Sequence, residues 1–424
     1  MLSERNEIKQ NLMGWIDENK NQMIKFLQEL IAVPSEDEQQ NIEMADFLAR
    51  RLKEFGFDNT QELEVIDSNQ ATQQPKKHIK NVLTIQSFGT GRNPEIVLNA
   101  YGDTVPPGIG WEYDPYDGEI NDGKLYGRGA SIAKSDISAY TFAVLALKAV
   151  AAEHVSGKVD LAYTFDGESG GLLGPNWLLN HQYIHPNMAI TPGFTHSILN
   201  AHKGCLQYKI TVTGKSAHSG NSEDAHDALE AMNAILHALY TYRKNLNEKK
   251  SDVNGIHSPT LTIGLIKGGT SINVVPDQCE IKIDRRFIPE ESAEEVEKEI
   301  DALVREAADS FEGIHVAIEP LLKVPTFGPI SEDTTLIQKL SENWRNIFEG
   351  ETLKIGGIPL YSDARHYANY GIPTVMFGVG PKAMQEANSY QANEHIEITD
   401  LLQATKIITL TLFDLLERNH ELLE

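Results

Sequence analysis

The sequence has few cysteines and no long apolar segment. Only Cys205 and Cys279 occur among its 424 residues, which excludes a disulfide framework and a zinc ribbon and indicates a reducing compartment. No run approaches the roughly 18 apolar residues that a membrane-spanning helix needs. The charged stretch 1–20 is unlike a signal peptide. We therefore expect a cytoplasmic protein.

Basic residues are scarce relative to acidic ones. Lys and Arg number 37 against 61 Asp and Glu, which gives a formal net charge of −24. Binding to nucleic acid or to an anionic membrane needs a basic face that neutralises phosphates, so we expect neither as a partner. A small ligand is compatible with this charge, because one basic pocket can lie within an acidic surface.

The length and the composition indicate two globular domains. Hydrophobic residues make up 41% and charged residues 23% of the chain, which is typical of packed proteins and not of disordered ones. A chain of 424 residues exceeds one ordinary domain and suits two.

Residues 1–204 have the pattern of an α/β domain. Apolar spacing predicts helices over 7–31 and about 42–55. Short apolar strands then alternate with helices, which is typical of a sheet with helices on both faces. The expected strands are 79–85, 95–100, 159–165 and 188–191, and the expected helices follow Lys134 and surround Trp177.

The pattern changes at Cys205 and changes back near residue 321. Between these points the segments 206–214, 261–269, 278–287 and 313–320 are expected strands, and 224–243 and 290–308 are expected helices. This β-α-β-β-α-β order fits a ferredoxin-like α+β insertion. The segment 321–424 resumes the α/β pattern with helices at 334–347 and 398–417 and a strand at 373–378. We therefore expect domain segments 1–204, 205–320 and 321–424.

Polar side chains gather where the expected strands end, which is the edge at which open α/β sheets bind ligands. Asp103, Glu168 and Thr191 follow or end three of these strands, and Tyr390 and Glu394 lie in the loop after a fourth. One acidic residue at a strand end is more often a helix cap or turn residue than a catalyst. Several strand ends that converge indicate a site.

Four motifs carry a resemblance to a known family. They are GDTVPPG with DGKLYGRGA, GKSAHSG around His218, GGTSINVVPDQCEIKIDRRFIP over 268–289, and SDARHYANYGIPTVMFGVGP over 362–381. The chain resembles the M20 metallopeptidases and amidohydrolases, which include acetylornithine deacetylase, succinyl-diaminopimelate desuccinylase and aminoacylases. The resemblance covers essentially the whole chain. It implies a zinc-peptidase-like α/β domain with a mixed sheet, interrupted by a smaller ferredoxin-like lid and dimerisation domain, and hence a homodimer.

The same resemblance implies amide hydrolysis by water bound between two zinc ions, with five protein ligands and a glutamate as general base. The matching ligand positions are Tyr101, Ile132, Glu168, Thr191 and Tyr390, and the position of the base is Gly167. Only Glu168 keeps a ligand side chain, and a glycine cannot act as a base. We therefore expect ordinary two-zinc hydrolysis to be absent and no cofactor to be bound, since zinc is implied by the resemblance alone.

Six residues match functional positions of the family. Asp103 and Glu168 lie at the metal site, and His218 matches a residue that stabilises the oxyanion in the partner subunit's site. An arginine suits a substrate carboxylate, although a structural salt bridge explains Arg286 equally well. The candidate catalytic residues are thus Asp103, Glu168 and His218, and the candidate substrate-binding residues are Asn273, Arg286 and Arg365.

Three hypotheses for the function follow. The first is a pseudo-enzyme that binds an amino-acid or peptide-like ligand, or a partner, without hydrolysis. The second is an active hydrolase of N-acyl amino acids or peptides with a rebuilt oxygen-rich metal site. Its ligands would be Asp103, Asp136, Glu168, Tyr101 and Tyr390. A simpler interpretation of the two tyrosines, which we favour, is that they fill the space of the metals and hydrogen-bond the carboxylates.

The third hypothesis is a shifted alignment. A metal would then be held by other histidines, such as His202 or His366. The run 169–171 fixes the register around Glu168 and argues against such a shift.

Overall fold

The computed structural model describes residues 2–67, 77–91 and 93–418. The chain forms two compact units, which we describe separately. The first contains Met1–Asn200, Ile330–Ile355 and Ser362–Glu424, and the second contains Ala201–Pro329 and Gly356–Tyr361. The larger unit is thus interrupted by the smaller one.

The first unit is built on a mixed sheet of eight strands in the order β1-β2-β6-β3-β7-β14-β8-β13. The central strands β6, β3, β7 and β14 run parallel to one another, whereas β1, β2 and β8 pair antiparallel with their neighbours. The strands are β1 (Gln61–Ile66), β2 (His78–Phe88), β3 (Glu95–Tyr101), β6 (Gly157–Thr164), β7 (Met188–Thr191), β8 (Ser197–His202), β13 (Lys354–Ile358) and β14 (Thr374–Met376).

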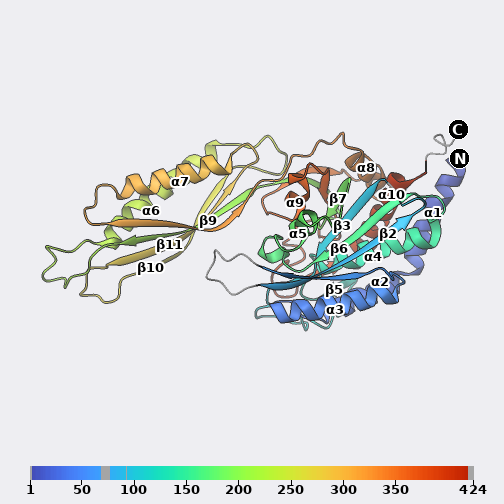
Figure 1. Ribbon diagram of the computed structural model, residues 1–424, viewed down its shortest axis with the longest axis horizontal. Coiled ribbons are helices and arrows are strands. Elements are labelled where there is room, and N and C mark those ends of the chain that lie inside the picture. The colour runs from blue at the N-terminus through green and yellow to red at the C-terminus, as the bar shows by residue number, and fades with distance from the viewer. Residues whose placement is uncertain (1, 68–76, 92, 419–424) are drawn as a thin grey trace. The chain divides into compact units, whose positions relative to one another are not determined.

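Helices cover both faces of this sheet (Figure 1). Successive strand residues point to opposite faces, so that Ile96 and Leu98 enter one buried cluster and Val97 enters another. The first cluster is closed by α1 (Leu2–Glu18), α2 (Lys20–Ile31), α3 (Glu38–Glu54), α4 (Lys134–Ala146), α8 (Thr335–Ile347) and α10 (Ile398–Leu416). The second is closed by α5 (Pro175–Asn180) and α9 (Ala364–Asn369).

The second unit has the expected ferredoxin-like topology. Its antiparallel sheet has the order β10-β11-β9-β12, and α6 and α7 pack on one face through Met232, Ile235 and Ile300. The helices begin where Asp227 and Ser292 accept hydrogen bonds from first-turn N–H groups. The elements are β9 (Gly204–Thr213), α6 (Ala228–Asn245), β10 (Thr260–Gly268), β11 (Gln278–Phe287), α7 (Ala293–Ala308) and β12 (His315–Val324).

The predicted fold class is confirmed, with local differences. The single helix expected over 7–31 is wrong, because the chain turns at Asn19, whose side-chain amide donates to Trp15 O at 2.8 Å. The strands β1 and β13 were not expected from the sequence. A third small sheet joins β15 (His395–Glu397), β5 (Lys124–Tyr126) and β4 (Ile120–Asn121). Within the described ranges, no helix is long and apolar enough to cross a bilayer.

Candidate functional site

Asp103 follows one strand of the first unit and hydrogen-bonds to the segment that follows the neighbouring parallel strand. The strands β3 and β6 pair in register up to Tyr101 and Thr164, so the residues that follow them lie side by side. Asp103 is 5% exposed, and its two carboxylate oxygens accept from Gly167 N and Glu168 N, each at 3.0 Å. The aspartate therefore fixes the loop that carries Glu168.

A glycine turn completes this loop. Gly170 and Gly171 have φ values of +104° and +66°, which glycine adopts without a steric penalty. The carbonyl of Gly170 accepts from His366 Nε2 at 2.9 Å and also from the Arg365 guanidinium. The helix α9 thereby holds the position of the loop from the other side.

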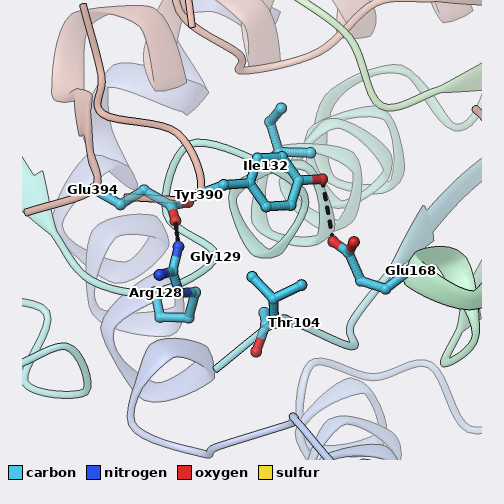
Figure 2. Close-up of a pocket in the computed structure, with 8 residues that line it drawn as sticks. Thr104, Arg128, Gly129, Ile132, Glu168, Tyr390 and Glu394 are labelled. Carbon is cyan, nitrogen blue, oxygen red and sulfur yellow. Dashed lines mark hydrogen bonds and ion pairs between the residues drawn. The ribbon is translucent and has the colours of Figure 1, made fainter. Parts of the chain in front are cut away.

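Two tyrosines extend from Glu168 in a chain of hydroxyl groups. Tyr390 OH donates to Glu168 Oε1 at 3.1 Å, a contact drawn in Figure 2. The Tyr101 hydroxyl lies 3.5 Å from the Tyr390 hydroxyl, so it donates the weaker bond of the pair, because the Tyr390 proton is already used. Tyr390 has a φ of +64°, an uncommon conformation for a bulky residue. Its backbone is therefore strained where its ring enters the site.

The Tyr101 side chain also occupies the space beside Gly167. A Cβ atom added at Gly167 would lie 2.4 Å from Tyr101 Cγ and 2.7 Å from Tyr101 Cβ. Real Cβ atoms do not approach other carbon atoms so closely, and a well-packed site cannot take them without shifting. Position 167 thus has no room for a side chain while Tyr101 keeps its place.

A small pocket lies next to Glu168 and Tyr390. Its cavity volume is about 10 Å³, room for about one water-sized group and far below the roughly 300 Å³ at which small-molecule sites begin. Figure 2 shows Glu168 on one side and Arg128 and Glu394 on the other, with Tyr390 extending from beside Glu394 to Glu168. Its lining consists of Thr104, Val105, Arg128, Gly129, Ile132, Glu168, Tyr390 and Glu394.

Arg128 and Glu394 form a buried ion pair in this pocket. Their side chains are 2% and 3% exposed, and Glu394 also accepts from Ser131 N at 3.0 Å and Ser131 Oγ at 2.9 Å. The Arg128 guanidinium stands 5.4 Å from the ring centroid of Trp111. Sequence reasoning did not assign Arg128 or Glu394 a role. The runs Gly-Arg-Gly and Asn-Glu could have drawn attention to these two residues. Their contact could not be predicted from one sequence, because they lie 266 residues apart.

Burial sets the protonation of the site. Burial, followed by the charge of Glu168, raises the pKa of Asp103 to about 7. Burial also raises the pKa of Glu168 to about 7, and the Tyr390 hydrogen bond opposes this rise. Burial, with the neighbouring acidic groups, raises the pKa of Tyr101 and Tyr390. Both phenols therefore stay protonated near neutrality and act as hydrogen-bond donors.

The structure separates Asp136 from the other residues of the expected oxygen-rich site. Asp136 is fully buried and accepts from Val379 N at 2.8 Å. No hydrogen bond within the described chain joins Asp136 to Glu168 or to the tyrosines. Thr191, at another family ligand position, is buried, and its hydroxyl donates to Val375 O at 3.4 Å. Ile132 lines the pocket with an apolar side chain.

The two histidines of the shifted-alignment hypothesis also have local partners. Burial lowers the pKa of His366 to about 4, and its Nε2 donates to Gly170 O. His202 lies fully buried, with its Nδ1 2.9 Å from Lys203 O. In the described parts of the chain, no group of three or more His, Cys, Asp or Glu side chains is arranged to hold a metal ion.

Arg365 lies near Glu168 but contacts the backbone. It is 3% exposed and donates to the carbonyls of Ser362 and Gly170. These contacts support the loop after β6.

The other sequence-predicted residues lie in the second unit. His218 and Asn273 are near each other, with His218 Nε2 3.4 Å from Asn273 Nδ2. Arg286 forms a bidentate ion pair with Asp284, in which Nε lies 2.8 Å from Oδ1 and Nη2 lies 3.1 Å from Oδ2. The structural salt bridge considered for Arg286 is therefore present.

The chain is similar to known amidohydrolases and peptidases. A family model described as a peptidase dimerisation domain matches residues 200–312. The acetylornithine deacetylase of Aliivibrio salmonicida is 30% identical over 262 residues, which cover 61% of this chain and 68% of the relative. The chain belongs to the M20 peptidase family.

Other proteins are similar to this chain in sequence or in fold over most of its length. The succinyl-diaminopimelate desuccinylase of Wolinella succinogenes is 27% identical over 338 residues, 77% of this chain and 86% of the relative. Human carnosine dipeptidase has a similar fold, with a TM-score of 0.75 at 16% identity over 96% of this chain and 98% of the other. A dinuclear metal-binding M20 peptidase of Bacillus subtilis has a TM-score of 0.65 at 16% identity, over 94% and 99% of the two chains.

A side chain at position 167 should destabilise the protein. We expect Gly167→Ala to lower the free energy of unfolding by about 1–3 kcal/mol, because its Cβ overlaps Tyr101. Urea denaturation of both proteins measures this change. Gly14→Ala is the matched control, since nothing lies within 4 Å of its added Cβ. Equal losses in the two variants, or none in either, would contradict the packing.

Tyr390→Phe should raise the pKa of Glu168 above about 7, because the variant loses the hydrogen bond that lowers it. A raised folded-state pKa means that stability falls as the pH rises from the unfolded value, about 4.3, towards the folded one. In Tyr390→Phe the fall in stability should therefore continue to a higher pH than in the wild type. Urea denaturation between pH 5 and 9 measures it, and Glu168→Gln, which cannot titrate, should remove the Glu168 part. Superimposable profiles of Tyr390→Phe and the wild type would refute the contact.

Proposed function

We propose that this M20 protein does not carry out ordinary two-zinc hydrolysis and binds the end of an amino-acid or peptide-like ligand. The proposal rests on the chain of hydrogen bonds that runs from Tyr101 through Tyr390 to Glu168. By the motif match, all three residues stand at family metal-ligand positions. The Tyr390 phenol occupies a lone pair of the remaining carboxylate, and the Tyr101 phenol hydrogen-bonds to Tyr390.

The donor set does not fit a pair of zinc ions. A zinc site needs three or four nitrogen, sulfur or oxygen ligands from the protein. Ile132 offers none, and Tyr390 donates its proton to Glu168. The hydroxyl of Thr191 is directed to Val375 O. The vacant base position at Gly167 also has no room for a carboxylate. These residues therefore do not provide for hydrolysis by metal-bound water.

The pocket nevertheless offers groups that suit an amino acid. Arg128 lines it, and Arg128 Nε is buried without a hydrogen-bond partner among the described residues. A ligand carboxylate would satisfy such a donor. Glu168, on the other side, can accept from an ammonium group. The small volume restricts the ligand to one end group in this pocket.

The second candidate function is an active hydrolase of N-acyl amino acids or peptides with a rebuilt metal site. Similarity to the deacetylase of Aliivibrio salmonicida and to a dinuclear metal-binding peptidase favours it. The hydrogen bond from Tyr390 OH to Glu168 opposes it, because the phenol donates its proton to the one retained carboxylate. A protonated phenol is a poor metal ligand compared with the phenolate.

Metal analysis and hydrolysis assays test the proposal together. After incubation with zinc, manganese and iron followed by desalting, we expect well below one metal per chain, because one carboxylate does not hold the ion. Hydrolysis of N-acetylornithine, N-succinyl-diaminopimelate and dipeptides should stay at the buffer rate. One or two metals per chain together with turnover, both abolished by Glu168→Gln, would establish the rebuilt-site hydrolase instead.

A restored variant provides the positive control. Tyr101→His, Ile132→Asp, Thr191→Glu and Tyr390→His together return four ligands and leave Gly167 in place, which avoids the overlap at that position. This variant should bind zinc, and addition of Glu168→Gln should weaken binding. A folded variant that binds no zinc would count against the alignment of these positions.

We also propose a cytoplasmic homodimer joined through the segment 205–320. The matched peptidase dimerisation domain supports the dimer, and two free cysteines suit a reducing compartment. Both edge strands have one irregularity in register, but β12 also contains Pro320, which has no N–H to donate, so we propose β10 as the edge for pairing. Ile266 on β10 is 54% exposed.

Sedimentation should detect a species of about twice 47.1 kDa at micromolar concentration. Ile266→Lys should shift it towards the monomer, because a charge would enter the apolar contact. Leu321→Lys on β12, where the wild-type residue is 44% exposed, is the matched control and should leave the dimer intact. A wild-type monomer would exclude the proposed assembly.

A further inference from the structure

A buried aspartate lies within the apolar strand β6 and outside the lining of the pocket at Glu168. Asp160 is fully buried and pairs with Ile85 on β2 and with Val97 on β3. Neither of its carboxylate oxygens receives a hydrogen bond from a donor of the described residues. An ionised carboxylate is strongly disfavoured in such surroundings, and the group takes up a proton instead.

The strand register places Glu95 beside this aspartate. In the parallel pair of β3 and β6, Glu95 lies opposite Lys158, and Val97 lies opposite Asp160. Side chains two positions apart in a strand point to the same face, so Glu95 and Asp160 are neighbours on one face of the sheet. This face carries the buried cluster that contains Val97 and Tyr367. The two carboxyl groups contact each other there.

The nearby donors are directed to Glu95. Its Oε1 accepts from His185 N at 2.6 Å, and its Oε2 accepts from Lys158 Nζ at 3.3 Å. These contacts favour the ionised form of Glu95, and two carboxylates in contact do not both ionise. Burial, followed by the charge of Glu95, raises the pKa of Asp160. Burial also acts to raise the pKa of Glu95, but the hydrogen bonds from His185 N and Asp160 lower it overall.

We propose that Asp160 is a neutral carboxylic acid at neutral pH, that its O–H donates to Glu95, and that this proton keeps the segment 185–187 attached to β3. Besides accepting from His185 N, Glu95 donates its N–H to Asn187 Oδ1 at 2.8 Å and accepts at its carbonyl from Asn187 N at 2.7 Å. The segment leads from α5 into β7. Loss of the proton to solvent would place two negative charges in contact and weaken this attachment. The proposal does not depend on the function proposed above, because none of these residues lines that pocket.

The groups around the pair determine when the proton leaves. Among the described elements packed against it, β6 contributes Lys158, and α9 contributes the phenol of Tyr367, which also lies near Asp160. The apolar Ile85 of β2 and Leu178 of α5 complete the surroundings. One lysine, already paired with Glu95, does not offset a second buried carboxylate. The proton is therefore held at neutral pH and leaves on a shift to alkaline pH.

Urea denaturation of the full chain between pH 5 and 9 tests the shared proton. A raised folded-state pKa means that stability falls as the pH rises from the unfolded value, about 3.9, towards the folded one. Asp160→Asn keeps a donor for Glu95 and cannot titrate. The unfolding constant of the wild type, divided by that of the variant, should therefore rise about tenfold per pH unit. Asp333→Asn, at an exposed position of the first unit, is the matched control and should parallel the wild type.

Hydrogen exchange tests the attachment of the segment. After correction for the intrinsic rate, protection of the His185 N–H should fall with rising pH in the wild type and stay constant in Asp160→Asn. A denaturation profile of Asp160→Asn parallel to that of the wild type would overturn the proton, and protection independent of pH in the wild type would overturn the attachment. Glu95→Gln provides a second test if Asp160→Asn does not fold. It removes the neighbouring charge, so its fall in stability should end at a lower pH than in the wild type, and an unchanged profile would also overturn the proposal.

Discussion

The candidate site depends on the contact between Asp103 and the backbone of Gly167 and Glu168. Parallel pairing of β3 and β6 brings these residues to one edge of the sheet. The two hydrogen bonds to Asp103 then fix the conformation of the loop after β6. Charge-assisted bonds from two N–H groups offset part of the cost of burying a carboxylate. The position of Glu168, and through it that of Tyr390, follows from this contact.

Much of the fold could be predicted from the sequence, because apolar periodicity decides which faces are buried. The ferredoxin-like order of the second unit and the alternating helices and strands of the first are examples. Apolar periodicity does not predict a helix end where a single polar side chain contacts the backbone. At the end of α1, Trp15 O accepts from both the backbone N and the side-chain amide of Asn19, a local side-chain contact that a regular apolar pattern conceals. Short strands such as β13 depend on neighbours distant in sequence.

The candidate site was predictable in position but less so in its contacts. Tyr101, Glu168 and Tyr390 were identified by their motifs, and the structure gives them one hydrogen-bond chain. Asp136 is the informative exception. One helical turn after Ile132 was expected to bring it to the site, but its carboxylate accepts from Val379 N. Helical spacing gives the face of a residue and does not say which backbone group will take its side chain.

The segment between β14 and β15 carries two residues of the candidate site. Tyr390 and Glu394 both line the pocket at Glu168. The strained backbone of Tyr390 lies only a few residues before Glu394. The Arg128 ion pair fixes one end of this stretch. The short segment from Tyr390 to Glu394 is therefore held at both ends, by Glu168 through the Tyr390 hydroxyl and by Arg128 through Glu394. These two contacts support a backbone conformation at Tyr390 that is costly for a bulky residue.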